Sequence, residues 1–195
     1  MPRFFSGLCF LIILLFIVMS GGCAVRATVD PTDVVGEDAL KSGLRAALRH
    51  GDWLVVRGVG AADNMFATIT NMPLSHAAIY DAERDEVIES DAEGVHTTSL
   101  DEFLARSHRV IVMQPMWATP GNRPAAVRQA RSLIGKGYNF TGIVGLNSPD
   151  RYYCTQVAIN AYMPFMTQKP QNPIPHIIKP GQMYHWGRII YDSGP

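Results

Sequence analysis

Three short segments rich in apolar and β-branched residues follow one another between residues 75 and 98, with only brief polar turns between them. The segments are residues 75–81, 86–90 and 94–98. A connection as short as Glu83-Arg84-Asp85 joins strands that run in opposite directions. The pattern therefore predicts a hairpin extended by a third strand, and with it an antiparallel sheet at the centre of the fold.

Periodic segments on both sides of this hairpin predict the remaining elements. We expect helices over residues 38–50, 61–70, 100–105 and 125–134, and strands over 53–58, 109–115 and 187–191. Prolines between residues 164 and 180 predict an extended loop there. Because no internal repeat or Gly/Ser linker divides the chain, residues 39–195 are predicted to form one α+β domain on a mostly antiparallel sheet.

The N-terminus has the composition of a secretory signal. Arg3 precedes an apolar run over residues 8–19, which is shorter than the ~20 residues that a membrane-spanning helix needs. The small residues before Cys23 fit a bacterial lipobox, although Ser20 stands where such boxes prefer Leu, so an uncleaved signal anchor is the alternative. We expect a signal peptide over 1–22, lipidation of Cys23, and a tether over 23–38. The domain would then be exported and membrane-anchored in the bacterial cell envelope, facing the periplasm.

Charge and cysteine content narrow the function classes. The formal net charge is +0, and no basic stripe suggests a nucleic-acid partner. Cys9 lies in the predicted signal and Cys23 would carry lipid, which leaves Cys154 as the only thiol of the mature domain. A single cysteine cannot serve a disulfide framework, so this count favours a functional thiol.

Residues 151–162 read as a turn followed by a short amphipathic helix with Cys154 in its first turn. Unpaired N–H groups and the helix dipole favour the thiolate at such a position. Free cysteines usually pack as small hydrophobic residues, so the segment alone favours a structural thiol. A nucleophile would need a base and a group that orients the base.

His76 is the best candidate for that base among the six histidines, because it opens an apolar strand directly after a turn. The hairpin brings Glu89 to the same end of the sheet. Glu89 could be a buried partner of His76 or an edge-strand charge in solvent, and the sequence leaves both open. Of the other histidines, His50 ends a predicted helix, and His96 and His108 are expected to be exposed beside turns. The sequence does not place His176 and His185.

Five segments in order carry a resemblance to a known family. They are Gly51-Asp52-Trp53-Leu54, Ser75-His76-Ala77-Ala78-Ile79-Tyr80, Val87-Ile88-Glu89-Ser90, Gly137-Tyr138-Asn139-Phe140-Thr141-Gly142 and Tyr153-Cys154-Thr155-Gln156. This ordered set resembles the YaeF/YiiX family of circularly permuted papain-fold, NlpC-like cysteine hydrolases. The resemblance implies that the sheet packs against the helix carrying the cysteine.

The same resemblance implies residue roles. Cys154 would be the nucleophile, His76 the general base and Glu89 the residue that orients His76. Tyr153 and Tyr138 could line the pocket. Gln156 and Ser90 depart from the family, which often has Glu and Ala there; Gln156 lies two residues beyond the nucleophile and is interpreted as a pocket, packing or capping position.

The implied activity is cleavage of an amide through a thioester acyl-enzyme by an envelope amidase or peptidase, with no metal or cofactor. Two alternatives stay open: an acyltransferase or lipid hydrolase of the lecithin:retinol acyltransferase-like kind, and an idle lipoprotein that binds an envelope ligand. The expected substrate is thus a peptide or a lipid-like acyl compound. The Pro-rich loop is expected to border the cleft. The oligomeric state cannot be predicted.

Overall fold

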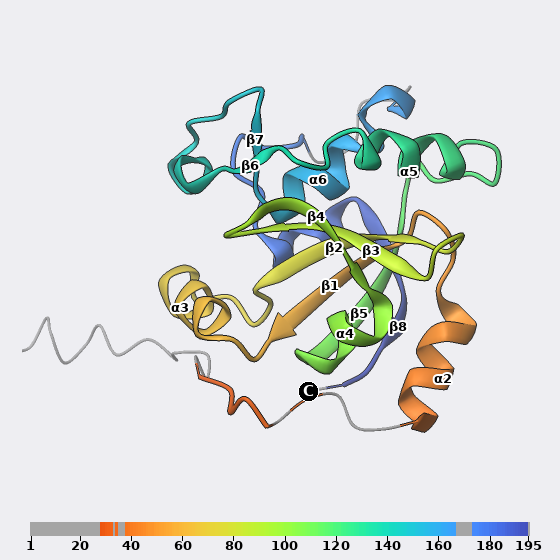
Figure 1. The fold of residues 1–195 in the computed structure, drawn as a ribbon, viewed down its shortest axis with the longest axis vertical. Helices are drawn as coiled ribbons and strands as arrows, with labels where there is room; N and C mark the ends of the chain where they lie inside the picture. Colours follow the sequence, from red (N-terminus) through yellow and green to blue (C-terminus); the bar gives the residue numbers. More distant parts are fainter. Residues whose placement is uncertain (1–27, 33, 35–37, 167–172, 195) are drawn as a thin grey trace, which may run out of the picture.

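An antiparallel sheet of six strands forms the centre of the molecule, in the order β4-β3-β2-β1-β5-β8 (Figure 1). The computed structural model describes residues 28–32, 34, 38–166 and 173–194. The strands are β1 (Trp53–Gly58), β2 (His76–Asp81), β3 (Glu86–Asp91), β4 (Gly94–Ser99), β5 (Ser107–Pro115) and β8 (Gly187–Asp192). The predicted hairpin and its third strand are confirmed as β2, β3 and β4, and so is the α+β class.

Helices cover both faces of this sheet. The α-helices are α2 (Asp38–Ala47), α3 (Ala61–Thr70), α4 (Leu100–Ala105), α5 (Arg123–Arg131) and α6 (Cys154–Asn160). Short 3-10 helices and a parallel two-stranded pair complete the fold: η1 (Phe140–Val144), η2 (Met163–Phe165), η3 (Pro180–His185), β6 (Gly137–Tyr138) and β7 (Arg151–Tyr152). In Figure 1, α5 and α6 lie on one face of the sheet, whereas α2 and α4 lie on the other.

Two apolar cores follow from this arrangement, one on each face. Ala77 and Ile79 of β2 pack into the core under α6, while Ala78 and Tyr80 pack into the core with α4. Successive strand residues point to opposite faces, so a strand buried on both faces must be apolar at every position. This explains why the segment after His76 shows no alternation between apolar and polar residues.

The differences from the expected elements are small. Helix α5 begins at Arg123 rather than Ala125, because Pro124 fits the first turn of a helix, and it ends at Arg131, so residues 132–134 form a turn. The segment after Gly137 contains η1, which was not predicted. The loop expected over residues 164–180 is bounded by the 3-10 turns η2 and η3.

Helix α3 follows β1 and is fastened to it at its first turn. Arg57 is buried, and its guanidinium donates to the carbonyl of Asp63 at 2.8 Å and to Oδ1 of Asn64 at 2.6 Å. None of the helices in the described ranges is both long and apolar enough to cross a membrane. The predicted signal over 1–22 and Cys23 lie outside the described residues.

Candidate active site

The register of the hairpin brings His76 and Glu89 together. Glu89 lies opposite Ala78 in the β2–β3 pair, so its side chain shares a face with Ala78 and, one strand period away, with His76. Nε2 of His76 lies 2.6 Å from Oε2 of Glu89. Strand β3 lies inside the sheet and the Glu89 carboxylate is fully buried, so the interpretation of Glu89 as a solvated edge-strand charge is wrong.

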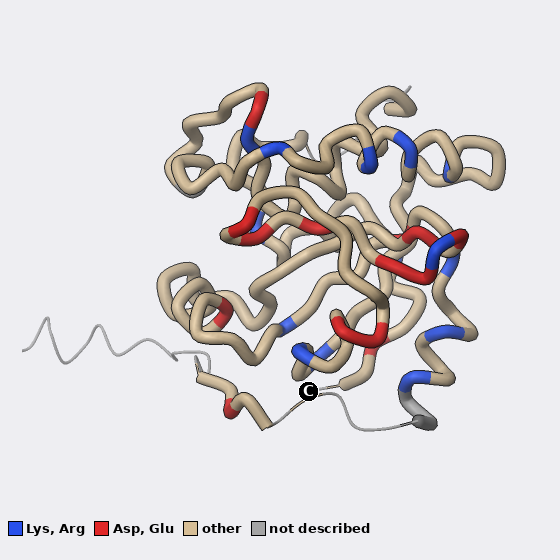
Figure 2. The backbone as a smooth tube through the Cα atoms, viewed as in Figure 1, with Lys and Arg blue, Asp and Glu red and all other residues tan. Residues whose placement is uncertain are grey.

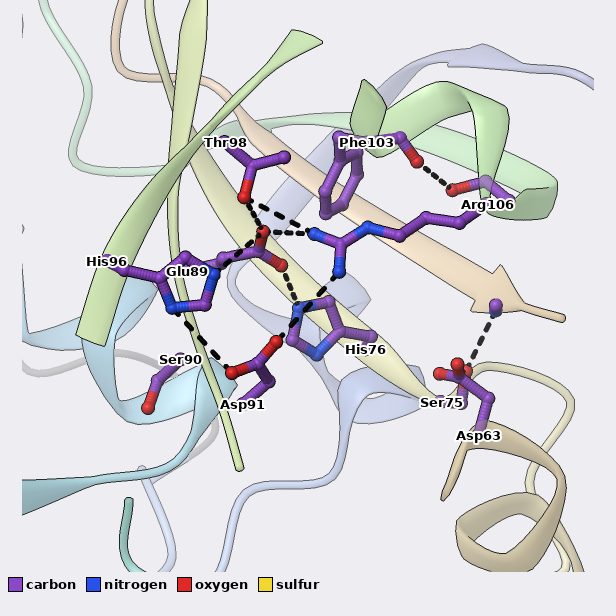
Figure 3. A network of polar contacts seen from close by, with 12 residues as sticks. Asp63, Ser75, His76, Glu89, Ser90, Asp91, His96, Thr98, Phe103 and Arg106 are labelled. Carbon is purple, nitrogen blue, oxygen red and sulfur yellow. Dashed lines mark hydrogen bonds and ion pairs between the residues drawn. The ribbon is translucent and has the colours of Figure 1, made fainter. Parts of the chain in front are cut away.

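The second carboxylate oxygen of Glu89 has its own partners (Figure 3). The Thr98 hydroxyl donates to Oε1 at 2.5 Å, and Nη2 of Arg106 donates to the same oxygen. His96, directly opposite Glu89 in the β3–β4 pair, places Nε2 3.6 Å from Oε1. His96 was expected to be exposed beside a turn; this is wrong, because it lies within β4 and half-buried against the carboxylate.

These contacts set the charges of the pair. Burial by itself raises the pKa of Glu89, but the hydrogen bond and charge of His76, the charge of Arg106 and the hydrogen bond from Thr98 outweigh it and lower that pKa to about 2. Burial lowers the pKa of His76, yet hydrogen bonds to Cys154 and Glu89 and the charges of both raise it well above its ordinary value. The geometry therefore favours an imidazolium beside a carboxylate.

Cys154 approaches His76 and Glu89 from helix α6, which packs on the face of the sheet opposite to α4. It is the first residue of α6, is almost fully buried, and is the one free cysteine in the described part of the chain. The Trp53 indole donates to the carbonyl of Ala158 at 3.0 Å and so fastens α6 to β1. The Thr155 hydroxyl donates to the carbonyl of Ile178 at 2.7 Å, which ties the beginning of α6 to the returning chain.

The thiol and the imidazole meet where α6 and β2 both begin. The Cys154 side chain is close enough to the His76 ring to raise the pKa of the imidazole, and both residues line the same cavity. Because Nε2 of His76 is engaged by Glu89, Nδ1 is the ring nitrogen left for the thiol. The three side chains thus form a chain of contacts from carboxylate to imidazole to thiol, the arrangement by which a base activates a nucleophile.

A cavity of about 580 Å³ opens beside the thiol, with Cys154 and His76 in its wall. Tyr138 and Tyr153 also line it. Much of the remaining wall is apolar and comes from β1, α3, α4, η1 and the chain before η3: Val56, Met65, Phe66, Ile69, Phe103, Phe140, Ile177 and Ile178. The expectation that the chain after α6 borders the cleft is confirmed.

Gln156 is not among the residues that line this cavity; it organises the beginning of α6. Its Oε1 accepts from the N–H of Tyr153 at 3.0 Å, and its Nε2 donates to Oδ1 of Asn147 at 2.7 Å. This is a capping arrangement, in which a side chain satisfies a backbone donor that the helix leaves unpaired. Ser90, the other departure from the family pattern, donates to the carbonyl of Tyr152 at 2.7 Å.

A second polar cluster lies on the α3 side of the cavity. The Ser75 hydroxyl donates to Oδ1 of Asp63 at 2.6 Å and accepts from the N–H of Gly58 at 2.9 Å. A Cβ at Gly58 would lie 2.3 Å from the Asp63 carboxylate, so a glycine is needed for this approach. Among the residues that the structure describes, no group of three or more His, Cys, Asp or Glu side chains is arranged to hold a metal ion.

Sequence reasoning missed Thr98, Arg106 and the placement of His96. Thr98 and His96 could have been found from the sequence. The short turn after Asp91 sets the β3–β4 register, which puts both residues on the same face of the sheet as Glu89. Arg106 carries no such signal: it follows α4, and only the crossing of that helix under the sheet brings its guanidinium to Glu89.

Comparison with known proteins agrees with this geometry. The family model described as permuted papain-like amidase enzyme, YaeF/YiiX, C92 family, matches residues 48–178. A crystal structure entitled metalloprotein yiiX from Escherichia coli O157:H7 is similar in fold, with a TM-score of 0.53 and 19% identity over 65% of this chain and 71% of that chain. A search of curated proteins found no match.

The family match spans the whole arrangement described above, from the strand β1 to the chain beyond α6 that borders the cavity. The similar crystal structure supports the fold independently. The chain belongs to the YaeF/YiiX, C92 family of permuted papain-like amidases, a family of cysteine hydrolases.

Proposed function

We propose that this protein cleaves an amide bond of a peptide in the bacterial cell envelope through a thioester acyl-enzyme, with Cys154 as nucleophile, His76 as general base and Glu89 as the residue that orients His76. The observation that carries the proposal is the position of the His76 imidazole. The ring is hydrogen-bonded to a buried carboxylate and lies close to the single described thiol, and both the ring and the thiol line one cavity.

The chemistry follows from the two contacts of His76. The raised pKa of His76 favours the imidazolium, which is the form that results when the ring takes the proton of the Cys154 thiol. The thiolate attacks the amide carbonyl, and the C–N bond breaks as the imidazolium gives its proton to the leaving amine. Water, deprotonated by the now neutral His76, then attacks the thioester and releases the carboxylic acid and the thiol.

The negative oxygen that develops on the carbonyl needs donors. As the first residue of α6, Cys154 has a backbone N–H without an acceptor inside the helix, and this N–H is the donor nearest to the thiol along the chain. The imidazolium would stay in place during attack because Glu89 holds Nε2.

The envelope location rests on the N-terminal sequence. Residues 8–19 and Cys23 have the pattern of a lipoprotein signal, so we propose an exported domain held at a membrane by lipid or by an uncleaved anchor.

One observation favours a second candidate, cleavage or transfer of a lipid-borne acyl group. The cavity wall is mostly apolar, and Phe66, Phe103 and Phe140 are among the residues that line it. Such a wall suits an acyl chain better than a peptide rich in charged groups.

Incubation with two substrate sets tests the proposal: peptides of peptidoglycan on one side and phospholipid vesicles on the other. We expect release of a new amino group from the peptides and a transient mass increase on the peptide containing Cys154, both absent in Cys154→Ala. Acyl groups transferred from lipid to Cys154, with the peptides untouched, would replace the first candidate by the second. No reaction with either, at normal folding, would contradict both.

A further inference from the structure

Exposed apolar side chains are concentrated in two segments of the molecule. Five large apolar side chains are 61–71% exposed, more than any other in the described ranges, where the next is 56% exposed. They lie in α3 and in or just after η1, and we call them the apolar rim: Met65, Ile69, Phe140, Val144 and Leu146. Single exposed apolar side chains are common on proteins, whereas a concentration of them marks a binding face.

Part of the apolar rim lines the cavity that has Cys154 in its wall. Met65 and Ile69 contribute to its wall from α3, and Phe140 contributes from η1. In Figure 1 these two segments lie on the same side of the molecule, at the left. Met65, Ile69 and Phe140 are exposed and also line the cavity, so whatever covers them also covers that part of the cavity.

The apolar rim carries almost no charge (Figure 2). Residues 61–70 and 140–146 contain one charged side chain, Asp63, whose carboxylate accepts from the Ser75 hydroxyl. No Lys or Arg occurs in either segment. Contact with a partner would therefore depend on apolar burial rather than on attraction to anionic groups.

The path of the N-terminal chain indicates what that partner is. The N–H of Val29 donates to Oδ1 of Asn64 at 2.9 Å, and Nδ2 of Asn64 donates to the carbonyl of Val29 at 3.2 Å. The chain toward the N-terminus thus leaves the domain at α3. Cys23 precedes Thr28 by five positions, which even a fully extended chain spans in at most about 18 Å.

We infer that the apolar rim rests on the surface of a lipid bilayer, so that the cavity opens toward the membrane. The inference rests on the membrane attachment proposed above. A lipid or anchor at or before Cys23 brings the bilayer close to α3, and the uncharged rim is suited to enter the boundary between head groups and acyl chains. Substrates would then reach Cys154 from the membrane side.

Quenching of tryptophan fluorescence by brominated acyl chains tests this orientation in the full chain, reconstituted in phosphatidylcholine vesicles. Ile69→Trp and Val144→Trp place a probe in each half of the rim. Met116→Trp is the matched control. Met116 is 54% exposed and directly follows Pro115, the last residue of β5. Gly58, which leads into α3, pairs with Ser107 at the other end of β5, so Met116 lies away from α3. The native Trp53, Trp117 and Trp186 are at most 9% exposed and provide the background.

We expect brominated lipid to remove most of the emission added at residues 69 and 144 and little of that added at 116. Replacing part of the lipid by phosphatidylglycerol should leave the result unchanged. Equal quenching at all three positions, or none at 69 and 144, would overturn the inference. The inference would also be overturned if the probes at residues 69 and 144 became shielded from solvent at high protein concentration without lipid. A second copy of the chain would then be what covers the apolar rim.

The same samples separate this inference from the proposed function. The rate of Cys154 alkylation depends on the thiol and its base, whereas quenching depends on orientation alone. Rim quenching together with an unreactive Cys154 would remove the proposed catalytic role and leave the lipid-contacting face.

Discussion

The two contacts of His76 are built in different ways. Its contact with Glu89 lies within one hairpin, where the β2–β3 register fixes both side chains on one face of the sheet. Its contact with Cys154 joins residues far apart in the sequence and depends on how α6 packs on the sheet. The first contact is local and buried, and the second is long-range and borders a cavity.

Because of this difference, the orientation of His76 and the reactivity of the Cys154 thiol depend on different parts of the molecule. Glu89 is held by Thr98 and Arg106 as well as by His76, so its position does not depend on the thiol. Within the described ranges no comparable network holds the thiol; α6 is seven residues long and is fixed by contacts such as the Trp53 hydrogen bond. We therefore expect changes in the hairpin to alter the charge of His76, and changes around α6 to alter its distance from the thiol.

His76→Ala removes both contacts and should have the largest effect. Loss of a general base costs ~10²- to 10⁴-fold in rate, and we expect amide hydrolysis to fall in that range. The check is the initial rate of peptide cleavage for the two proteins. His185→Ala, which replaces an exposed histidine in η3, should keep the full rate. Retained cleavage in His76→Ala would remove His76 from the site.

Glu89→Gln keeps the shape of the side chain and removes its charge. We expect a loss of ~10²-fold in rate, because the imidazole is no longer held as a cation in one orientation. The charge of Glu89 raises the pKa of His76, so its removal lowers that pKa. The alkaline limb of the pH–rate profile should therefore move to lower pH.

The control for this change is Glu83→Gln, which removes an exposed carboxylate in the turn between β2 and β3, away from the cavity wall. Its alkaline limb should match that of the unchanged protein. If Glu89→Gln leaves the alkaline limb in place as well, Glu89 does not set the charge of His76.

Much of the local half of the site could be predicted from the sequence. The polar turn at residues 83–85 fixes the hairpin, and the hairpin brings His76 to Glu89. The sequence could not show that Glu89 is buried, because this burial depends on β4 and α4 lying against β3. Cys154 could be placed at a helix start, but its proximity to His76 came from the family resemblance, since no local pattern links residues so far apart.

Trp53→Phe tests the long-range contact between His76 and Cys154, which depends on the packing of α6. It should have the smallest effect. It retains an aromatic ring in the core and removes the hydrogen bond to the carbonyl of Ala158, which we expect to lower the free energy of unfolding by ~1–2 kcal/mol. Urea unfolding measures this. The alkaline limb should not move, because the hairpin is intact. A shifted limb at unchanged stability would show that the two halves are coupled in another way.

The most direct test of the central claim, that His76 activates Cys154, is the pH dependence of Cys154 alkylation by iodoacetamide. The label is followed by mass spectrometry on the peptide containing Cys154, so that Cys9 and Cys23 do not interfere. We expect rapid alkylation already at pH 6 in the unchanged protein, and loss of this low-pH reaction in His76→Ala. A rate that rises only near the ordinary thiol titration at about 8.5, and equally in both proteins, would contradict the account.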